Sequence, residues 1–251
     1  TLFTPMNTTE FQRRYGTGMT PPARRLFVNE LLTPARLLLD PDQWRRLPRD
    51  VDGGGQPVML LPGLGAGPGS MWLIRRYLRQ CGFRTWDWGQ GKNRGDVQAL
   101  APRVVERLQG LVKQVGEPFA LVGWSLGGYI SREIARECPA LVRRVVTIGS
   151  PLVGGPKYTT VARVYEKRGL AMDDLEAATL ERYTTPLQRP VRALYSESDG
   201  VVAWRACIDR FSDDVEHIRV GGTHLGLGFS KQVLRRLPGL LVDDQRQPDR
   251  A

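Results

Sequence analysis

Residues 121–128 read L-V-G-W-S-L-G-G, and this stretch decides the expected fold. An apolar run ends at Trp124, Ser125 follows, and Gly123 and Gly127 flank the serine two residues away on either side. A hydroxyl is lifted clear of a sheet edge only where the backbone turns sharply from strand to helix, and that turn requires neighbours without side chains. The stretch therefore predicts a buried strand, a tight turn that presents Ser125, and a helix. The simpler alternative is a serine that caps the helix, with glycines beside it by chance.

The rest of the chain alternates between short apolar runs and amphipathic stretches. We expect strands over residues 57–61, 84–88, 119–124, 144–148, 191–196 and 217–220. We expect helices over residues 71–81, 96–115, 126–137 and 230–237. Strands separated by helices form parallel sheets with right-handed crossovers, and strands that are apolar throughout indicate helices on both faces. The predicted class is therefore α/β, with a mostly parallel sheet of at least six strands.

Two segments lie outside this alternation. The first 50 or so residues have no clear periodicity and contain several prolines, so we expect an arm packed on the core, with helical turns over 27–32 and 35–39. About 40 residues between the fourth and fifth strands exceed an ordinary loop, and helical stretches over 159–168 and 173–182 indicate a small insertion. The expected divisions are an arm over 1–54, a core over 55–150 and 190–242, an insertion over 151–189 and a frayed tail over 243–251.

A serine hydroxyl becomes a strong nucleophile only when a base accepts its proton and an acid orients that base. The chain contains two histidines. His224 lies in the glycine-rich loop V-G-G-T-H-L-G-L-G after the last expected strand, whereas His217 lies within that strand, so His224 is the expected base. Asp199 follows the end of the fifth expected strand and precedes the glycine that a turn favours, so it is the expected acid. Glu197 is the competing acid.

The same chemistry requires N–H donors for a developing oxyanion. One donor is expected from Leu126, directly after the serine, and another from Leu64 in the loop L-L-P-G-L-G that follows the first strand. Glycines in this loop could also cradle a phosphate. The loop lacks the G-K-[ST] ending of a phosphate-binding loop and the later acidic residue of a dinucleotide site, so we do not expect nucleotide binding.

The composition narrows the range of partners. The formal charge is +10, yet only five of the 36 basic residues are lysine, and the arginines are spread along the chain rather than gathered in one element beside aromatic residues. This distribution indicates a solvated basic surface rather than a nucleic-acid site, with weak attraction to anionic surfaces left open. Three scattered cysteines and two histidines are too few for a disulfide framework or a histidine-rich metal site.

Apolar runs in the sequence are short. None approaches the roughly 20 residues of a membrane span, so we expect no stable membrane insertion, while peripheral contact stays open. A cytoplasmic location is expected, and export is left open because a leader could have been removed before the first threonine.

The ordered motifs L-L-P-G-L-G, L-V-G-W-S-L-G-G, S-E-S-D-G-V-V and G-T-H-L-G-L-G resemble the α/β-hydrolase superfamily over roughly residues 55–240. Three further stretches resemble a group of bacterial lipase- or esterase-like hydrolases, namely T-W-D-W-G-Q-G-K-N-R-G-D, T-I-G-S-P-L-V-G-G-P and D-G-V-V-A-W-R-A-C. The resemblance implies the α/β-hydrolase fold, a triad of Ser125, Asp199 and His224, and a cap formed by the insertion.

Two departures from the pattern of this superfamily are evident. Pro62 and Gly63 stand where many members have a His-Gly pair, at the expected oxyanion loop. The usual leading antiparallel strands are also missing from the expected elements, although the proline-rich arm could contain one.

The resemblance implies a serine hydrolase that cleaves carboxylic esters by two-step acyl transfer, in which Ser125 attacks the carbonyl and water then hydrolyses the acyl-enzyme. We expect no metal or organic cofactor and a small-molecule or lipid ester as substrate. Trp124, beside the serine, is expected to line an apolar acyl site, although a buried tryptophan is as often part of a core.

Other activities fit the same residues. Thioester hydrolysis, acyl transfer to an alcohol, and a catalytically silent binding scaffold remain as alternatives, because a fold does not guarantee an activity. A dehalogenase is disfavoured, because its nucleophile would be a carboxylate at position 125. The sequence leaves the oligomeric state, the acyl chain and the alcohol open.

Overall fold

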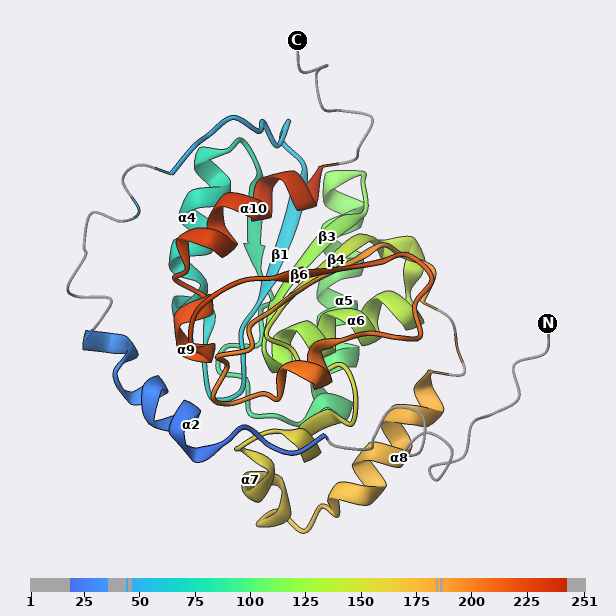
Figure 1. Cartoon of the computed structure of the whole chain (residues 1–251). Coiled ribbons are helices and arrows are strands. Elements are labelled where there is room, and N and C mark those ends of the chain that lie inside the picture. Colours follow the sequence, from blue (N-terminus) through green and yellow to red (C-terminus); the bar gives the residue numbers. More distant parts are fainter. Residues whose placement is uncertain (1–18, 36–43, 45–46, 184, 186, 243–251) are drawn as a thin grey trace.

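The apolar runs of the sequence form one six-stranded sheet in which every pair of neighbouring strands is parallel (Figure 1). The structure is a computed structural model that describes residues 19–35, 44, 47–183, 185 and 187–242. The strand order is β2-β1-β3-β4-β5-β6. The strands are β1 (Pro57–Leu61), β2 (Arg84–Asp87), β3 (Phe119–Trp124), β4 (Val142–Ile148), β5 (Val191–Tyr195) and β6 (Val215–Arg219). The predicted α/β class with a parallel sheet is therefore confirmed.

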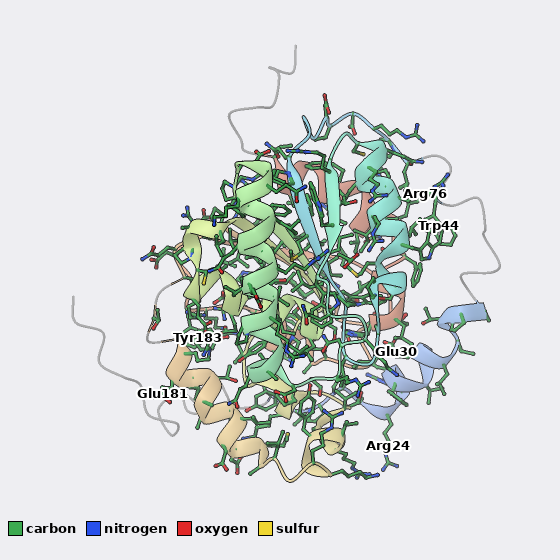
Figure 2. All side chains as sticks on the ribbon, turned by 180° about the vertical axis from the view of Figure 1, so that it is seen from behind. Arg24, Glu30, Trp44, Arg76, Glu181 and Tyr183 are labelled. Atoms are coloured by element: carbon green, nitrogen blue, oxygen red, sulfur yellow. The ribbon has the colours of Figure 1, made fainter. Side chains whose placement is uncertain are left out.

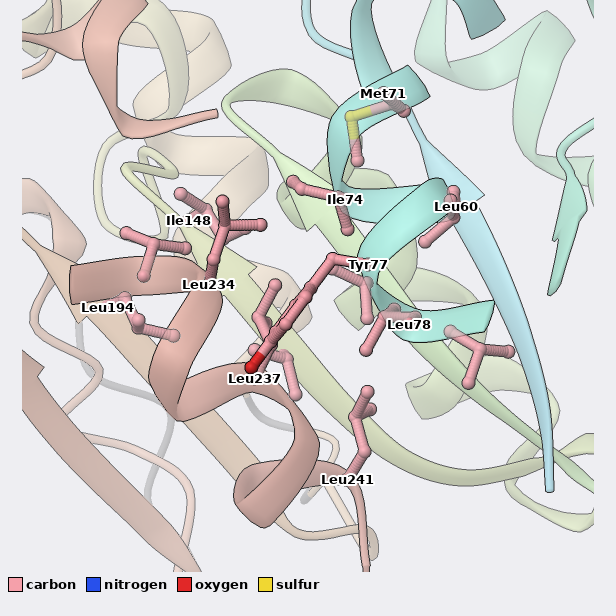
Figure 3. Packing of buried hydrophobic residues seen from close by; sticks show 14 of the residues in the cluster. Leu60, Met71, Ile74, Tyr77, Leu78, Ile148, Leu194, Leu234, Leu237 and Leu241 are labelled. Atoms are coloured by element: carbon pink, nitrogen blue, oxygen red, sulfur yellow. The ribbon is translucent and has the colours of Figure 1, made fainter. Parts of the chain in front are cut away.

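Helices cover both faces of the sheet. Along β1, Val58 and Leu60 point into one apolar cluster, and Met59 and Leu61 point into another, as the two-residue period of a strand requires. The first cluster is covered by α4 (Trp72–Gln80) and α10 (Lys231–Leu241), whose side chains interlock over the sheet in Figure 3. The second is covered by α5 (Val97–Val115) and α6 (Leu126–Glu137). Because both faces are covered, β1 and β3 are buried along their whole length.

Differences from the predicted elements lie at their ends. β4 begins two residues earlier than expected, because Val142 pairs with Phe119 of β3. β6 begins at Val215, which lies opposite Val191 of β5. α10 continues four residues beyond its predicted end, through Pro238, because Leu241 continues the buried apolar stripe of that helix. A short 3-10 helix, η2 (Pro68–Met71), precedes α4.

The strand order defines where a site can form. β1 lies between β2 and β3, so the chain leaves β1 toward one edge of the sheet and later returns to its other side. In open parallel sheets the crevice outside the carboxyl ends of the strands, at this change of direction, is the usual place for ligands. The loop after β1, with Leu64, and the turn after β3, with Ser125, both lie at the carboxyl ends of these strands.

The segment between β4 and β5 contains η4 (Gly155–Tyr158), α7 (Ala162–Glu166) and α8 (Met172–Arg182). In Figure 1 α7 and α8 lie at the lower end of the molecule, and α9 (His224–Leu227) lies at the left, above α2. Backbone contacts join this segment to the loop after β5, through an antiparallel bridge between Thr159 and Val202 and a hydrogen bond of 2.9 Å from the Val153 N–H to the Ala206 carbonyl. The same loop contains η5 (Trp204–Cys207), and η3 (Pro139–Leu141) precedes β4.

In the N-terminal region, α2 (Arg24–Leu31) lies beside α9 in Figure 1, and residues 33–35 just after it are also helical. The predicted turn over 27–32 falls mostly within α2. The predicted turn over 35–39 lies, except for its first residue, outside the described residues, and so does the predicted frayed tail over 243–251. Within the described part of the chain, every helix is too short or too polar to cross a membrane.

Candidate active site

Ser125 occupies the strained turn that its sequence context predicts. Among the described residues other than glycine it is the one with a positive φ, 56°, and it directly precedes α6. Its N–H donates a hydrogen bond of 2.8 Å to the carbonyl of Ile148, at the end of β4. A side chain in this backbone conformation costs about 1–3 kcal/mol, which persists only when surrounding contacts enforce it. The turn therefore holds the serine at the carboxyl edge of the sheet.

The contacts that enforce this turn require glycine on both sides of the serine. A Cβ atom at Gly123 would lie 2.3 Å from the backbone nitrogen of Gly128, and one at Gly127 would lie 2.2 Å from the carbonyl oxygen of Leu61 in β1. Backbone atoms cannot yield as a flexible side chain does. The strand, the turn and the helix thus pack at distances that no other residue type permits.

Asp199 and His224 meet at the same edge of the sheet. Their side chains are joined by a contact of 2.7 Å between His224 Nδ1 and Asp199 Oδ2, and both residues are buried. The other oxygen of Asp199 accepts the N–H groups of Val201 and Val202, at 2.8 Å and 2.7 Å, so the carboxylate is held in one orientation. Burial opposes the charged imidazole, but the charge and hydrogen bond of Asp199 and the charge of Glu30 outweigh it and raise the pKa of His224.

The Asp199–His224 pair lies next to the serine turn. The ring of His224 is 6.3 Å from the ring of Trp124, the residue before Ser125. A Cβ atom at Gly149 would lie 3.1 Å from Asp199 Oδ2 and 3.2 Å from His224 Nδ1, and Gly149 directly follows the residue that accepts the Ser125 N–H. Within the described part of the chain, the Ser125 hydroxyl and His224 are not joined by a hydrogen bond.

The competing acid and base lie elsewhere. Glu197 points to the surface, where its carboxylate pairs with Arg219 at 2.8 Å. His217 lies within β6, paired in register with Ala193 and near Asp209. Burial lowers the pKa of His217, in contrast to that of His224.

The loop after β1 passes close to the serine. A Cβ atom at Gly63 would lie 3.1 Å from Ser125 Cβ and 3.7 Å from its Oγ, so the backbone that leads to Leu64 passes against the hydroxyl. Leu126 is the first residue of α6, where a helix N–H has no carbonyl partner in a preceding turn. Both predicted donors therefore belong to segments that border Ser125.

Asn93, which the sequence analysis did not single out, braces this loop. It is fully buried, its side-chain amide donates to the Pro62 carbonyl at 2.9 Å, and its backbone carbonyl accepts the Gly65 N–H at 2.7 Å. A polar residue between glycines, in G-K-N-R-G, was the available signal for such a brace.

Trp124 is packed within the core. It belongs to the apolar cluster beneath α4 and α10, its ring lies edge-to-face with Phe229 at 6.2 Å, and a Cβ atom at Gly228 would lie 2.6 Å from it. Most of the contacts of Trp124 are therefore those of a core residue, the second of the two interpretations that the sequence allowed. Its contact with the His224 ring is what places one side of it near the proposed site.

Glu30 of α2 is a further polar residue that sequence reasoning missed. Its carboxylate is buried and accepts backbone N–H groups of Gly200 and His224. A single acid in the apolar stretch L-F-V-N-E-L-L was the only available signal, and an exposed side chain explains such an acid equally well. Among the described residues, no three His, Cys, Asp or Glu side chains are grouped so that they could hold a metal ion.

Comparisons with known proteins bear on this geometry. The model of the "Alpha/beta hydrolase family" matches residues 58–246. A search of curated proteins found no match. Among solved structures, a Bacillus licheniformis lipase, BlEst2, is similar with a TM-score of 0.58 and 15% identity, covering 76% of this chain and 94% of that one. A Paleococcus ferrophilus monoacylglycerol lipase gives 0.54 and 17%, covering 76% and 96%.

A thioesterase domain from the curacin biosynthetic pathway is also similar, with a TM-score of 0.50 and 12% identity over 73% of this chain and 90% of that one. At these identities the structural likeness concerns the fold alone. The family match is different, because it spans most of the chain, from β1 to beyond the end of α10, and so includes the segments that carry the proposed serine, acid and base. The chain therefore belongs to the alpha/beta hydrolase family.

Proposed function

We propose that this hydrolase cleaves carboxylic esters, with Ser125 as nucleophile, His224 as general base and Asp199 as the acid that orients the imidazole. The observation that carries the proposal is the 2.7 Å contact between His224 Nδ1 and Asp199 Oδ2, made beside a serine held at a positive φ. That contact leaves Nε2 as the nitrogen available to a hydroxyl, which is the arrangement that serine acyl transfer requires.

The proposed reaction has two halves. The Ser125 hydroxyl adds to the ester carbonyl as His224 takes its proton, the N–H groups of Leu64 and Leu126 stabilise the oxyanion, and the alcohol leaves with the proton from the imidazolium. Water then attacks the acyl-enzyme by the same proton transfers and releases the acid. In this proposal the segment between β4 and β5 is a cap over the site, and Trp124 forms part of the wall that faces the acyl group.

Turnover of p-nitrophenyl esters of increasing chain length tests this proposal. We expect Ser125→Ala to lower kcat/KM by at least about 10³-fold while the protein stays folded, because without the nucleophile only binding and the oxyanion donors remain. A fluorophosphonate probe is expected to label the native chain at Ser125 and to leave Ser125→Ala unlabelled. Equal turnover of the two proteins would remove Ser125 from the mechanism.

The two histidines provide a matched pair of variants. His224→Ala is expected to lose activity as severely as Ser125→Ala, whereas His217→Ala is expected to stay within about threefold of the native rate, because its ring lies in β6 beside Asp209. The reverse result would mean that the base is wrongly assigned. Acyl thioesters of the same chain lengths, assayed beside the oxygen esters, separate ester hydrolysis from the thioesterase alternative.

A further inference from the structure

The Glu30 carboxylate joins three separate parts of the chain. It belongs to α2, in the N-terminal region, and it is only 1% exposed. Its Oε1 accepts the Gly200 N–H at 2.8 Å and the His224 N–H at 2.6 Å, and its Oε2 accepts the Leu225 N–H at 2.9 Å. In Figure 2 it lies on the side of α2 that faces the body of the molecule.

The Gly200 N–H belongs to the loop after β5 that carries the proposed acid, and the His224 and Leu225 N–H groups begin α9, at the end of the loop after β6. Gly200 directly follows Asp199, and His224 is itself the proposed base. The carboxylate is therefore a shared acceptor that sets the distance between the loop after β5 and the loop after β6. The two loops are also joined directly where they leave their strands, because the Ser196 hydroxyl donates to the Gly222 carbonyl at 2.6 Å. The hydrogen bond between Asp199 and His224, further along both loops, depends on both being in place.

Close packing of α2 supports this role. A Cβ atom at Gly200 would lie 2.4 Å from the carbonyl oxygen of Leu26, so the backbone of α2 touches the backbone of the acid loop. Nearby, the Thr33 and Thr223 hydroxyls are 2.6 Å apart and form a second, uncharged link between the same N-terminal segment and the loop before His224. The position of α2 against both loops is thus specified by backbone contact as well as by the carboxylate.

We propose that Glu30 is a positioning residue for the active site: its buried carboxylate holds the acid and base loops together so that Asp199 and His224 stay aligned with Ser125. This inference rests on the proposed function. A carboxylate suits the task because it only accepts hydrogen bonds, and here it faces three donors. An amide in its place would turn an N–H₂ group toward a backbone N–H.

The charge of Glu30 adds a second, measurable effect on the imidazole. The charged groups that act on His224 among the described residues are Asp199, from the loop after β5, and Glu30, from α2. Both stabilise the imidazolium and raise the pKa of His224, against the opposing effect of burial. The neutral imidazole is the active base, so loss of the Glu30 charge lets the proton leave at lower pH. The rising limb of the kcat/KM profile then moves to lower pH.

Glu30→Gln tests the proposal. We expect kcat to fall about 10- to 100-fold with KM within about threefold, because misplaced catalytic groups lower the rate of chemistry more than they weaken substrate binding. The rising pH limb should also move to lower pH. The titration of the His224 ring proton, followed by NMR, should shift in the same direction. Only two histidines are present, and His217→Gln assigns the signals.

Thr33→Val is the matched control. It removes the uncharged link between the same two segments and leaves the carboxylate in place. We expect its melting temperature to fall as that of Glu30→Gln does, while kcat stays within about twofold and the His224 titration is unmoved. If Thr33→Val reproduced the kinetic and titration effects, or if folded Glu30→Gln showed neither, Glu30 would be no more than an attachment point for α2.

Glu30→Asp covers the case in which the glutamine variant does not fold. It keeps the charge but shortens the side chain by one methylene, so we expect a lower kcat with a native His224 titration, and a native kcat would overturn the proposal.

The NMR titration requires no substrate. If Ser125→Ala proved as active as the native chain, the proposed function would fail, yet the titration would still report whether Glu30 acts on the imidazole.

Discussion

Ser125 illustrates how a single residue depends on neighbours that have no side chains. Its positive φ is possible because Gly123 and Gly127 allow β3, the turn and α6 to pack backbone against backbone. Such strain is commonly found where a side chain must be presented in one orientation. The orientation of the proposed nucleophile therefore depends on these two glycines.

Gly127→Ala tests this dependence. A Cβ atom 2.2 Å from the Leu61 carbonyl must displace backbone of β1, so we expect the free energy of unfolding to fall by about 1–3 kcal/mol, measured by urea denaturation. Turnover should fall about 100-fold, because the serine moves with the turn. Gly110→Ala is the control: nothing lies within 4 Å of its added Cβ in α5, and the protein should gain about 0.5–1 kcal/mol. Native stability and turnover in Gly127→Ala would contradict the steric argument.

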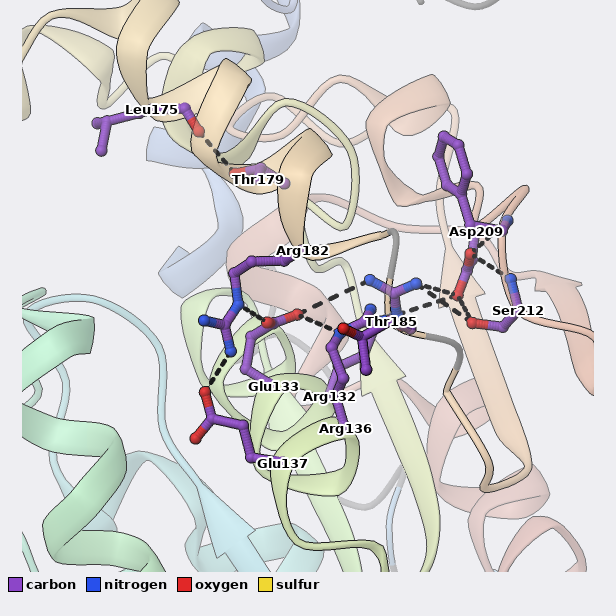
Figure 4. Close-up of polar contacts among 11 residues, drawn as sticks. Arg132, Glu133, Arg136, Glu137, Leu175, Thr179, Arg182, Thr185, Asp209 and Ser212 are labelled. Atoms are coloured by element: carbon purple, nitrogen blue, oxygen red, sulfur yellow. Dashed lines mark hydrogen bonds and ion pairs between the residues drawn. The ribbon is translucent and has the colours of Figure 1, made fainter. Parts of the chain in front are cut away.

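Among the elements, α6 connects the serine turn to parts of the chain far from it. Arg132, in the middle of this helix, is fully buried and pairs with Asp209 at 2.7 Å, and its guanidinium lies 4.5 Å from the Tyr183 ring centroid. Figure 4 shows this pair beside a second set of contacts, in which Glu133 of α6 binds Arg182 of α8. The helix that begins after the proposed nucleophile is therefore joined by a fully buried ion pair to the loop before β6 and by a partly exposed one to the segment between β4 and β5.

Asp209→Ala is expected to be strongly destabilising for this reason. It removes the nearer carboxylate of the buried Arg132 guanidinium and leaves Glu133 at 4.0 Å, and removing one partner of a buried pair costs about 3–5 kcal/mol. Glu117→Gln breaks the exposed pair between Arg84 and Glu117 and is expected to cost at most about 1 kcal/mol. Denaturant unfolding of both variants provides the measurement. Equal losses would show that burial is not what makes the Arg132 pair important.

Over the whole molecule, apolar burial is unevenly distributed. Two large clusters fill the spaces between the sheet and its helices. Apart from Leu187, which belongs to the second of them, the segment between β4 and β5 contributes to two small clusters, one around Val153, Leu180 and Tyr183 and the other around Tyr158. Local opening is easiest where few apolar contacts must be broken. The sheet is therefore expected to be the most stable part of the protein.

Hydrogen exchange followed by mass spectrometry tests this expectation. Amides of β1, β3 and β4 should exchange slowest, and those of α7 and α8 should exchange much earlier, through local opening that leaves the sheet intact. α5, a helix packed on the sheet, provides the comparison and should exchange later than α8. Protection of α8 equal to that of β3 would mean that the buried ion pairs, rather than apolar area, control its stability.

How well the sequence predicted the bounds of each element depends on how far apart in the sequence the residues that define it lie. β1, β3 and α6 have the predicted bounds, because each is specified by its own apolar pattern and by glycines close in sequence. β4, β6 and α10 differ at their ends, where pairing or packing with a distant strand extends the element. Asn93 and Glu30 were missed, since their roles consist of hydrogen bonds to residues 31 and up to 195 positions away.

Local patterns in the chain determined the parallel sheet, its helical layers and the strained turn at Ser125, because periodicity and glycine spacing act over a few residues. Folding in three dimensions decided which acid and which base meet: Asp199 and His224 are 25 positions apart, and Glu197 and His217 fitted the sequence pattern as competitors. It also brought Glu30 to both loops. The physical reason is that hydrogen bonds between distant segments depend on how the layers pack, and no local pattern records that packing.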